Sequence, residues 1–152
     1  MKVAVVTPTI GAATLKKCVE SVQNQTYDNI THYVFIDGCQ YEPKAREILV
    51  GSPKTRMIEL EENVGKGWYG HRVFAACSFL VNADIIVYLD EDNWFDSQHV
   101  NSMLHLFKQR ELDWAYSLRK LVDVNGNFIS NDDCDSLGVY PNWKNVPFVD
   151  MN

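Results

Sequence analysis

The stretch "IIVYLDEDNWFD", residues 85–96, joins five apolar residues directly to three consecutive acids. The apolar run has the length and composition of a central β-strand that is buried on both faces. Adjacent carboxylates repel one another, and a strand end beside a hydrophobic core is a poor place to solvate them. The rest of the chain must therefore explain why Asp90, Glu91 and Asp92 lie together at this position.

The composition is that of an ordinary globular protein. The chain has 152 residues, of which 46% are hydrophobic and 22% charged, so we expect one domain with a substantial core. Its formal net charge is −6, which argues against a nucleic-acid or anionic-membrane partner. A small anionic ligand is still compatible with this charge if a cation lies between the ligand and the protein.

The cysteines and the N-terminus indicate a compartment. The four cysteines form no C-x-x-C pair, which is typical of free thiols in a reducing environment. The apolar run "VAVV" at residues 3–6 is too short for a signal segment or a membrane span and predicts a first strand. We therefore expect a cytoplasmic protein.

The order of apolar patterns predicts an α/β fold. The strands are apolar throughout rather than alternating, which favours a largely parallel sheet covered by helices. After residue 112 the pattern alternates and contains Asn125-Gly126, which predicts an antiparallel hairpin. The expected strands are 3–6, 32–38, 56–60 and 84–89, and the expected helices are 11–25, 42–50, 70–82 and one capped by Asp96 or Ser97.

Ligands of such folds bind beyond the carboxyl ends of the strands. The segments "TPT", "IDG", "ENVGKG" and "LDEDN" all fall there. Asp90 and Asp92 can reach one divalent cation together or through its waters, and their oxygen ligands suit Mg²⁺ or Mn²⁺. The competing interpretation is a solvated acidic turn in which Asp92 or Asp96 caps the next helix. The position after a buried central strand favours the cation.

Four segments in sequence order resemble GT-A-fold glycosyltransferases close to family 2. They are "VVTPTIGAATLKKCVESVQNQTY" (5–27), "YVFIDG" (33–38), "NVGKGWYGHR" (63–72) and the D-x-D segment "YLDEDNWF" (88–95). The resemblance implies a Rossmann-like, mostly parallel central sheet flanked by helices, with an antiparallel C-terminal part. It implies a single domain, 1–152, in which 1–110 binds the nucleotide-sugar and 111–152 forms the acceptor side.

The resemblance also implies an activity. A family 2-like enzyme would move a sugar from a nucleotide diphosphate, here a UDP-sugar, to an acceptor with inversion, using Mn²⁺ or Mg²⁺. The acceptor class is open: a glycan, a lipid-linked molecule or a small molecule. The alternative is a sugar-nucleotide-binding module with weak or no catalysis, for which the short C-terminal region of this chain is the best support.

The donor-site residues follow from the matching motifs. Pro8 and Thr9 would line the nucleoside pocket. Asp37 would accept a hydrogen bond from the base, a role that favours uracil because its ring N–H is a donor. Asn63 and Gly65 would lie near the base and ribose, with the glycine permitting a close approach of the backbone.

The acids of the D-x-D segment would hold the rest of the donor. Asp90 would contact ribose or sugar hydroxyls and share the metal, and Asp92 would hold the metal that bridges the diphosphate. A glycine-rich loop before a helix also binds anions readily, although a solvated loop has the same composition. The remaining candidates for donor contact are Lys66, His71, Arg72, Glu91 and Trp94.

An inverting displacement needs a carboxylate base on the acceptor side. The acids there are Asp123, Asp132, Asp133, Asp135 and Asp150. Asp123 precedes the predicted turn, and the "NDDCD" cluster is equally compatible with a solvated loop. Asp150 ends the apolar run "VPFVD" as Asp90 ends "IIVYL", so Asp150 is the candidate catalytic residue.

Other enzyme classes fit less well. A dinucleotide-binding oxidoreductase needs G-x-G-x-x-G after the first strand, where this chain has "TPTIGAAT". A nucleotidyltransferase would have a glycine-rich loop with a basic residue at the same place. A two-metal phosphatase or nuclease would have acids at more than one strand end, and the first strand carries none.

Overall fold

The computed structural model describes residues 1–67, 69–123 and 125–132. The chain divides into two compact units, Met1–His105 and a second unit that begins at Leu106. The predicted division into a donor part (1–110) and an acceptor part (111–152) stays a prediction. No helix in the described part of the chain is long and apolar enough to cross a membrane.

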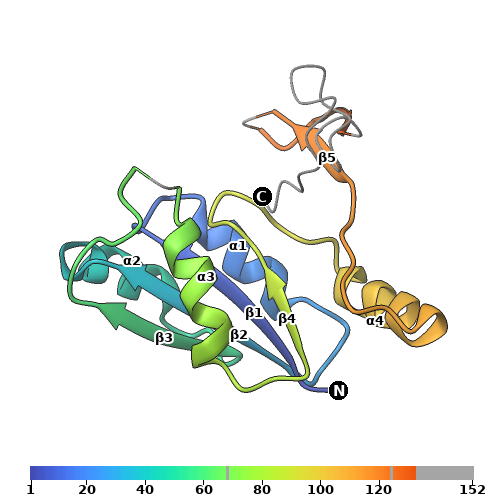
Figure 1. Cartoon of the computed structure of the whole chain (residues 1–152). Coiled ribbons are helices and arrows are strands. Elements are labelled where there is room, and N and C mark those ends of the chain that lie inside the picture. The colour runs from blue at the N-terminus through green and yellow to red at the C-terminus, as the bar shows by residue number, and fades with distance from the viewer. Residues whose placement is uncertain (68, 124, 133–152) are drawn as a thin grey trace, which may run out of the picture. The chain divides into compact units, whose positions relative to one another are not determined.

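The first unit alternates strands and helices, as the apolar patterns predict (Figure 1). The predicted helix 11–25 is shorter than expected, because Gly11 has a φ of 74° and residues before Leu15 form a loop. The elements are β1 (Val3–Thr9), α1 (Leu15–Gln23), β2 (Ile30–Asp37), the 3₁₀-helix η1 (Cys39–Tyr41), α2 (Glu42–Leu49), β3 (Thr55–Leu60), α3 (His71–Leu80), β4 (Ile85–Tyr88) and α4 (His99–Arg110), which continues into the second unit.

The four strands form a parallel sheet in the order β3-β2-β1-β4. β1 lies between β2 and β4, and all seven of its residues are buried. Among the residues that the structure describes, β4 is one of the two edge strands, and its four residues are half-buried. Within these residues, the expected central position of this strand is therefore not found. An apolar run reports that both faces are covered, but not how many strands lie beside it.

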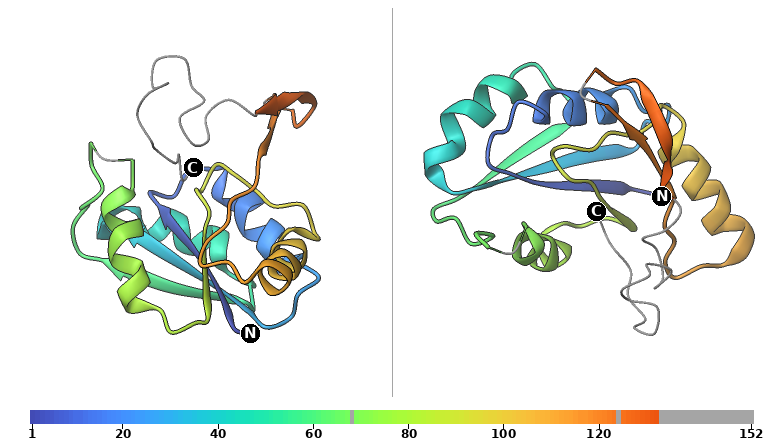
Figure 2. Two further views of the ribbon diagram at one scale, coloured as in Figure 1. Left: turned by 45° about the vertical axis from the view of Figure 1, so that its right-hand side comes forward. Right: turned by 90° about the horizontal axis from the view of Figure 1, so that it is seen from above.

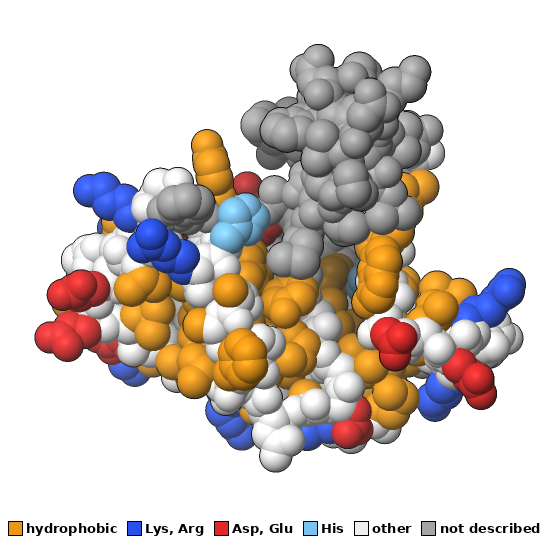
Figure 3. Space-filling view, in the orientation of Figure 1, with side chains coloured by type: hydrophobic (Ala, Val, Ile, Leu, Met, Phe, Trp, Pro, Cys, Tyr) orange, Lys and Arg blue, Asp and Glu red, His pale blue; other side chains and the backbone are white. Residues whose placement is uncertain are grey.

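Helices cover both faces of this sheet. In the right-hand view of Figure 2, α1 and α2 lie on one face and α3 on the other. α3 packs Val73, Phe74 and Cys77 against Val6 and Phe35. On the same face, hydrophobic side chains gather over α3 and β4 (Figure 3). Burial of each such aliphatic or aromatic side chain contributes about 1.5–3 kcal/mol, so the packing of α3 on the sheet is stabilising.

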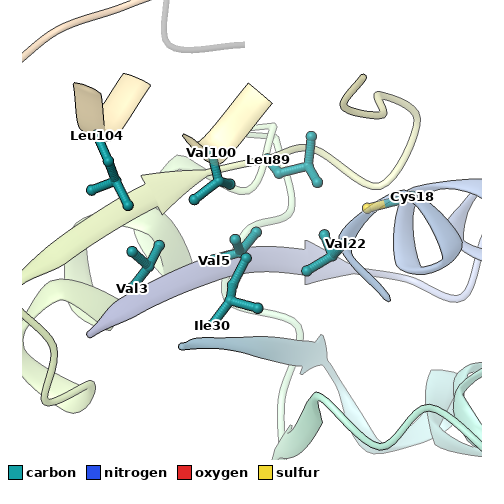
Figure 4. Close-up of a cluster of buried hydrophobic side chains, with 8 residues drawn as sticks. All are labelled: Val3, Val5, Cys18, Val22, Ile30, Leu89, Val100 and Leu104. Atoms are coloured by element: carbon teal, nitrogen blue, oxygen red, sulfur yellow. The ribbon is translucent and has the colours of Figure 1, made fainter. Parts of the chain in front are cut away.

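Two core clusters lie between the sheet and the helices of the opposite face. One joins α1 to β2 and α2. In the other, side chains of β1, α1, β2, α4 and the residue that follows β4 point towards one another (Figure 4): Val3, Val5, Cys18, Val22, Ile30, Leu89, Val100 and Leu104. The four predicted apolar positions of α1 (Leu15, Cys18, Val19 and Val22) are all buried in these clusters.

The start of α4 is held by a residue far away in the sequence. The buried side chain of Gln25 accepts a hydrogen bond from the Val100 amide at 3.0 Å and donates to the Asp96 carbonyl at 2.8 Å. Asp92 lies in a turn well before α4 begins at His99, so it does not cap this helix. The interpretation of Asp92 as a helix cap is therefore wrong.

The described part of the second unit contains the predicted hairpin. β5 (Arg119–Val122) and β6 (Phe128–Asp132) pair antiparallel. Gly126 has a φ of 87°, which favours glycine at that position of the turn. Asp123 Oδ1 accepts the amides of Asn125 and Asn127, both at 2.8 Å. The Asn-Gly signal thus correctly located a turn that its own flanking aspartate closes.

Candidate active site

The predicted polar residues meet at one edge of the sheet. Thr9 ends β1, Asp37 ends β2, and Asp90 follows β4 closely. β1 pairs in parallel with both neighbours, with Thr9 opposite Ile36 and Val6 opposite Tyr88. Because the strands run in the same direction, their carboxyl ends lie together (Figure 1).

Asp37 holds the loop that follows β3. Its side chain is only 3% exposed, and its carboxylate accepts the Val64 amide at 2.8 Å and the Gly65 amide at 2.9 Å. Its main-chain carbonyl accepts a hydrogen bond from Asn63 Nδ2 at 2.9 Å. The predicted base contact Asp37 and the predicted ribose contacts Asn63 and Gly65 therefore form one hydrogen-bonded group.

Gly65 is required by this packing. A Cβ atom at Gly65 would lie 2.5 Å from Asp37 Oδ2 and 3.1 Å from the Cα of Gly70. Gly70 in turn approaches Pro8, whose Cβ would be 3.3 Å from an added side chain. The backbone at Gly65 thus approaches the Asp37 carboxylate closely, while its expected approach to the base and ribose stays a prediction.

The three acids lie in and beside a tight turn. The Asn93 amide donates to the Asp90 carbonyl at 3.1 Å and closes a turn over Asp90–Asn93. Asp90 is half-buried and Asp92 is exposed. The carboxylates of Asp90 and Asp92 lie on one hydrogen-bonded turn and can therefore be presented to the same ligand.

Glu91 points into the loop between β1 and α1. Its carboxylate accepts hydrogen bonds from the Thr9 hydroxyl, from the Ala12 amide at 3.1 Å and from the Ile10 amide at 3.4 Å. The Thr9 hydroxyl also accepts the Gly11 amide at 2.9 Å. These donors relieve the repulsion that Glu91 would otherwise meet beside Asp90 and Asp92.

Trp94 is also attached to α1. The Lys17 ammonium lies 3.3 Å from the centroid of the Trp94 ring, in cation–π contact. The Trp94 side chain is 37% exposed. One ring face is thus covered by Lys17, and the predicted stacking on a sugar would have to use the other face.

The three predicted basic contacts lie after β3 and in the first turn of α3. Lys66, His71 and Arg72 are exposed, and Arg72 Nη1 is 3.5 Å from the Val64 carbonyl. Their donor contacts stay predictions. Asp150, the candidate base, lies outside the described residues, as do Asp133 and Asp135.

The carboxylates of the acid turn suit a hard divalent cation as ligands. Within the described ranges, no group of three or more His, Cys, Asp or Glu residues could hold a metal ion. Mg²⁺ and Mn²⁺ do not need such a cage in sites of this kind, because they take one or two carboxylates and complete their shell with waters and substrate phosphates. Asp90 and Asp92 on one turn fit that requirement.

Burial and charge shift two groups beneath the site. Burial raises the pKa of the Cys18 thiol to about 12, and the charges of Glu91, Asp90 and Asp92 add to that effect against a hydrogen bond from Thr7. Burial lowers the pKa of His32 to about 3; its Nε2 lies 2.9 Å from Thr7 Oγ1. At neutral pH the buried Cys18 thiol is therefore protonated and the buried His32 imidazole is neutral.

Sequence reasoning missed the partners of Glu91 and the Thr7–His32 pair. Thr9 and Glu91 are 82 positions apart, and two of the three donors to Glu91 are backbone amides, which carry no sequence signal. Cys18, Cys39 and Cys77 are free thiols, as predicted, and Cys134 lies outside the described residues.

A family model described as "Glycosyl transferase family 2" matches residues 4–148. The chain belongs to glycosyltransferase family 2. The match covers the strand ends, the loop after β3 and the acid turn, so the expected family is confirmed on the residues that suggested it. A search of curated proteins finds no match to this family 2 chain.

Solved structures of S. aureus TarS share its fold. TarS 1–349 superposes with a TM-score of 0.60 at 13% identity, covering 84% of this chain and 43% of that one. A longer TarS structure gives 0.58 at 18% identity, covering 90% and 24%. TarS 1–349 in complex with UDP-GlcNAc gives 0.59 at 14% identity, covering 83% and 42%. The family 2 chain spans less than half the length of these TarS chains, and the likeness confirms the GT-A fold.

Proposed function

We propose that the chain is a metal-dependent glycosyltransferase that moves a sugar from a UDP-sugar to an acceptor with inversion. The observation that carries this proposal is the meeting of three strand ends, at which Thr9, Asp37 and the acid turn lie along one edge of the sheet. Family 2 membership supplies the reaction class. The acceptor is a glycan, a lipid-linked molecule or a small molecule.

The nucleoside would bind beside Asp37. Its carboxylate is oriented by the Val64 and Gly65 amides, and each oxygen retains a second acceptor position. The uracil ring N–H is a donor and matches that acceptor, whereas the corresponding nitrogen of cytosine is itself an acceptor. Pro8, Thr9 and Asn63 would complete the pocket for base and ribose.

The diphosphate would bind beside the acid turn. Asp92, together with Asp90, would hold Mn²⁺ or Mg²⁺. Such a cation, when bound, neutralises the diphosphate and stabilises it as a leaving group. Lys66 in the loop after β3 and Arg72 at the start of α3 would add positive charge, which helps an acidic chain to hold an anionic donor, and His71 would contact the donor beside them. Structures of TarS with UDP-GlcNAc and with UDP support the choice of a uridine diphosphate donor.

Calorimetry of UDP binding tests the metal requirement. We expect binding with Mn²⁺ and none with EDTA, and we expect Asp92→Ala to abolish the metal-dependent part because it removes a carboxylate ligand. Asp96→Asn, which removes one negative charge nearby, is the matched control and should bind as wild type does. Equal UDP affinity with Mn²⁺ and with EDTA contradicts the proposal.

The base preference is tested by comparing UDP with CDP. Cytosine would face the Asp37 carboxylate with an acceptor and leave both groups unpaired, at a cost of about 1–3 kcal/mol. We therefore expect CDP to bind about five- to 100-fold more weakly than UDP. Equal affinity would show that Asp37 does not read the base. Release of UDP from UDP-sugars, with and without acceptors, separates a transferase from a binding module.

A further inference from the structure

Glu91, the middle acid of the D-x-D segment, already accepts hydrogen bonds from other residues of the chain. A carboxylate has about four acceptor positions, and Glu91 uses its two oxygens for three donors of the β1–α1 loop. These donors are the Thr9 hydroxyl and the amides of Ile10 and Ala12. Glu91 therefore has little remaining capacity for a metal ion or a donor hydroxyl.

These contacts join two segments that both border the proposed donor site. Glu91 belongs to the turn closed by the Asn93 amide and the Asp90 carbonyl, so a constraint on Glu91 also constrains Asp90 and Asp92. In the β1–α1 loop, the Thr9 hydroxyl donates to Glu91 and accepts a hydrogen bond from the Gly11 amide, so the contact with Glu91 also holds the backbone at Gly11. The Lys17–Trp94 contact adds a second attachment close by, between α1 and the residue that follows the turn.

We propose that Glu91 is a positioning residue: its carboxylate holds the acid turn (Asp90–Asn93) against the β1–α1 loop (Thr9–Ala12), and it touches neither metal nor donor. The inference rests on the proposed function, since it concerns the same donor site. It assigns Glu91 a different role from the donor contact that the motif implies. The acids and the nucleoside loop then form one preorganised surface.

Two substitutions separate the effect of the length of the Glu91 side chain from the effect of its charge. Glu91→Gln keeps the reach, and its carbonyl oxygen can accept both the Ala12 amide and the Thr9 hydroxyl, but it removes the charge. Glu91→Asp keeps the charge but is one methylene, about 1.5 Å, too short for the loop. A positioning role predicts that Glu91→Gln binds UDP with Mn²⁺ almost as wild type does and that Glu91→Asp binds about tenfold more weakly.

A role through charge predicts the reverse order. If Glu91 ligated the metal, Glu91→Asp would retain binding and Glu91→Gln would lose it, which overturns the proposal. Unchanged UDP affinity in both variants, with or without a lower melting temperature, also overturns it, since Glu91 would then be structural only. Should Glu91→Asp fail to fold, Glu91→Ala and Thr9→Val carry the test, because their effects on UDP affinity should not add if they break the same contact.

Amide exchange gives a readout that does not depend on the proposed function. In Glu91→Asp the Ala12 amide loses its acceptor and should exchange faster than in wild type, while in Glu91→Gln it should stay protected. Unchanged exchange in Glu91→Asp contradicts the attachment. If the Ala12 amide exchanges faster in Glu91→Asp than in wild type, but wild type does not bind UDP, the proposed function fails while Glu91 still holds the loop.

Discussion

At the scale of single residues, Asp37 shows how a buried carboxylate organises a loop. A buried charged group is tolerated only when it is hydrogen-bonded, and Asp37 obtains its donors from the amides of Val64 and Gly65. A glycine at position 65 is what allows the loop to approach closely enough for those bonds. The hydrogen bonds of Asp37 at the end of β2 therefore require a glycine at position 65 of the loop.

Gly65→Ala should break this arrangement. The new Cβ would meet Asp37 Oδ2 at 2.5 Å, so the loop must move away and the amide bonds must lengthen. We expect UDP affinity to fall about tenfold or more, measured by calorimetry. Gly67→Ala is the control. Gly67 has a φ of 77°, but no atom of the described residues beyond its chain neighbours would lie within 4 Å of the new Cβ, so the variant should cost about 1 kcal/mol of stability and leave UDP affinity nearly unchanged. Equal effects of the two variants would contradict the steric argument.

His32 should make folding sensitive to acid. Burial lowers its pKa from 6.5 to about 3, so below pH 6.5 the unfolded chain binds a proton that the folded chain does not. Stability therefore falls as the pH drops from about 6.5 towards 3, by up to about 1.4 kcal/mol per pH unit, and is unaffected by this group above pH 7. Urea unfolding of wild type and His32→Gln between pH 7 and 5 measures the difference in slope. Parallel slopes would show that His32 does not contribute.

At the scale of elements, the β5–β6 hairpin depends on one aspartate. Asp123 accepts the amides of Asn125 and Asn127 with one oxygen, and its other oxygen accepts Asn127 Nδ2 at 2.9 Å. These hydrogen bonds, the one from the Asn127 side chain first, lower the pKa of Asp123. The turn is thus stabilised by the charged form of its own first residue.

Asp123→Ala should loosen this hairpin without unfolding the parallel sheet. The amides of Asn125 and Asn127 lose their acceptor and should exchange faster with solvent, as measured by NMR. Because the pKa of Asp123 is lowered, the protection in wild type should persist below the ordinary aspartate pKa of 3.8 and disappear as the pH falls further. Asp113→Ala, at another exposed acid, is the control and should leave both amides protected. Unchanged exchange in Asp123→Ala would contradict the role of the carboxylate.

At the scale of the whole molecule, the proposed reaction would require an acidic chain to hold an anionic donor and also to activate an acceptor. The residues proposed to bind the donor all lie in the first unit, whose strand ends meet at one edge. The predicted acceptor side, 111–152, would supply the base. Asp150 stays the candidate for that role, with the proton of the acceptor hydroxyl passing to its carboxylate during displacement.

Asp150→Asn should separate donor binding from transfer. We expect UDP affinity to stay nearly unchanged and transfer to fall by about 10² to 10⁴, because an amide cannot accept the proton. Sugar transfer from the UDP-sugar identified by the release assay measures this. Asp133→Asn and Asp135→Asn are the matched controls in the neighbouring acidic cluster. Full transfer by Asp150→Asn, or an equal loss in a control, would rule out Asp150 as the base.

The sequence by itself determined the order and type of the elements and the family. These features are local: apolar runs predict parallel strands, the spacing of Leu15, Cys18, Val19 and Val22 predicts a helix face, and Asn125-Gly126 predicts a turn. The polar segments at the strand ends could also be assigned to one edge, since parallel strands bring their carboxyl ends together. This reasoning correctly placed Asp37, Asp90 and Asp92 at that edge of the sheet.

Only the tertiary structure decided how these segments contact one another. The place of β4 at the edge of the described sheet depends on which strands pair, and an apolar run contains no information about pairing. Gln25 holds the start of α4 across 75 positions, and Asp37 holds the loop at Gly65 across 28. Glu91 turns towards the β1–α1 loop because backbone amides there need an acceptor. Every residue type except proline has such an amide, so folding alone determines which side chain it meets.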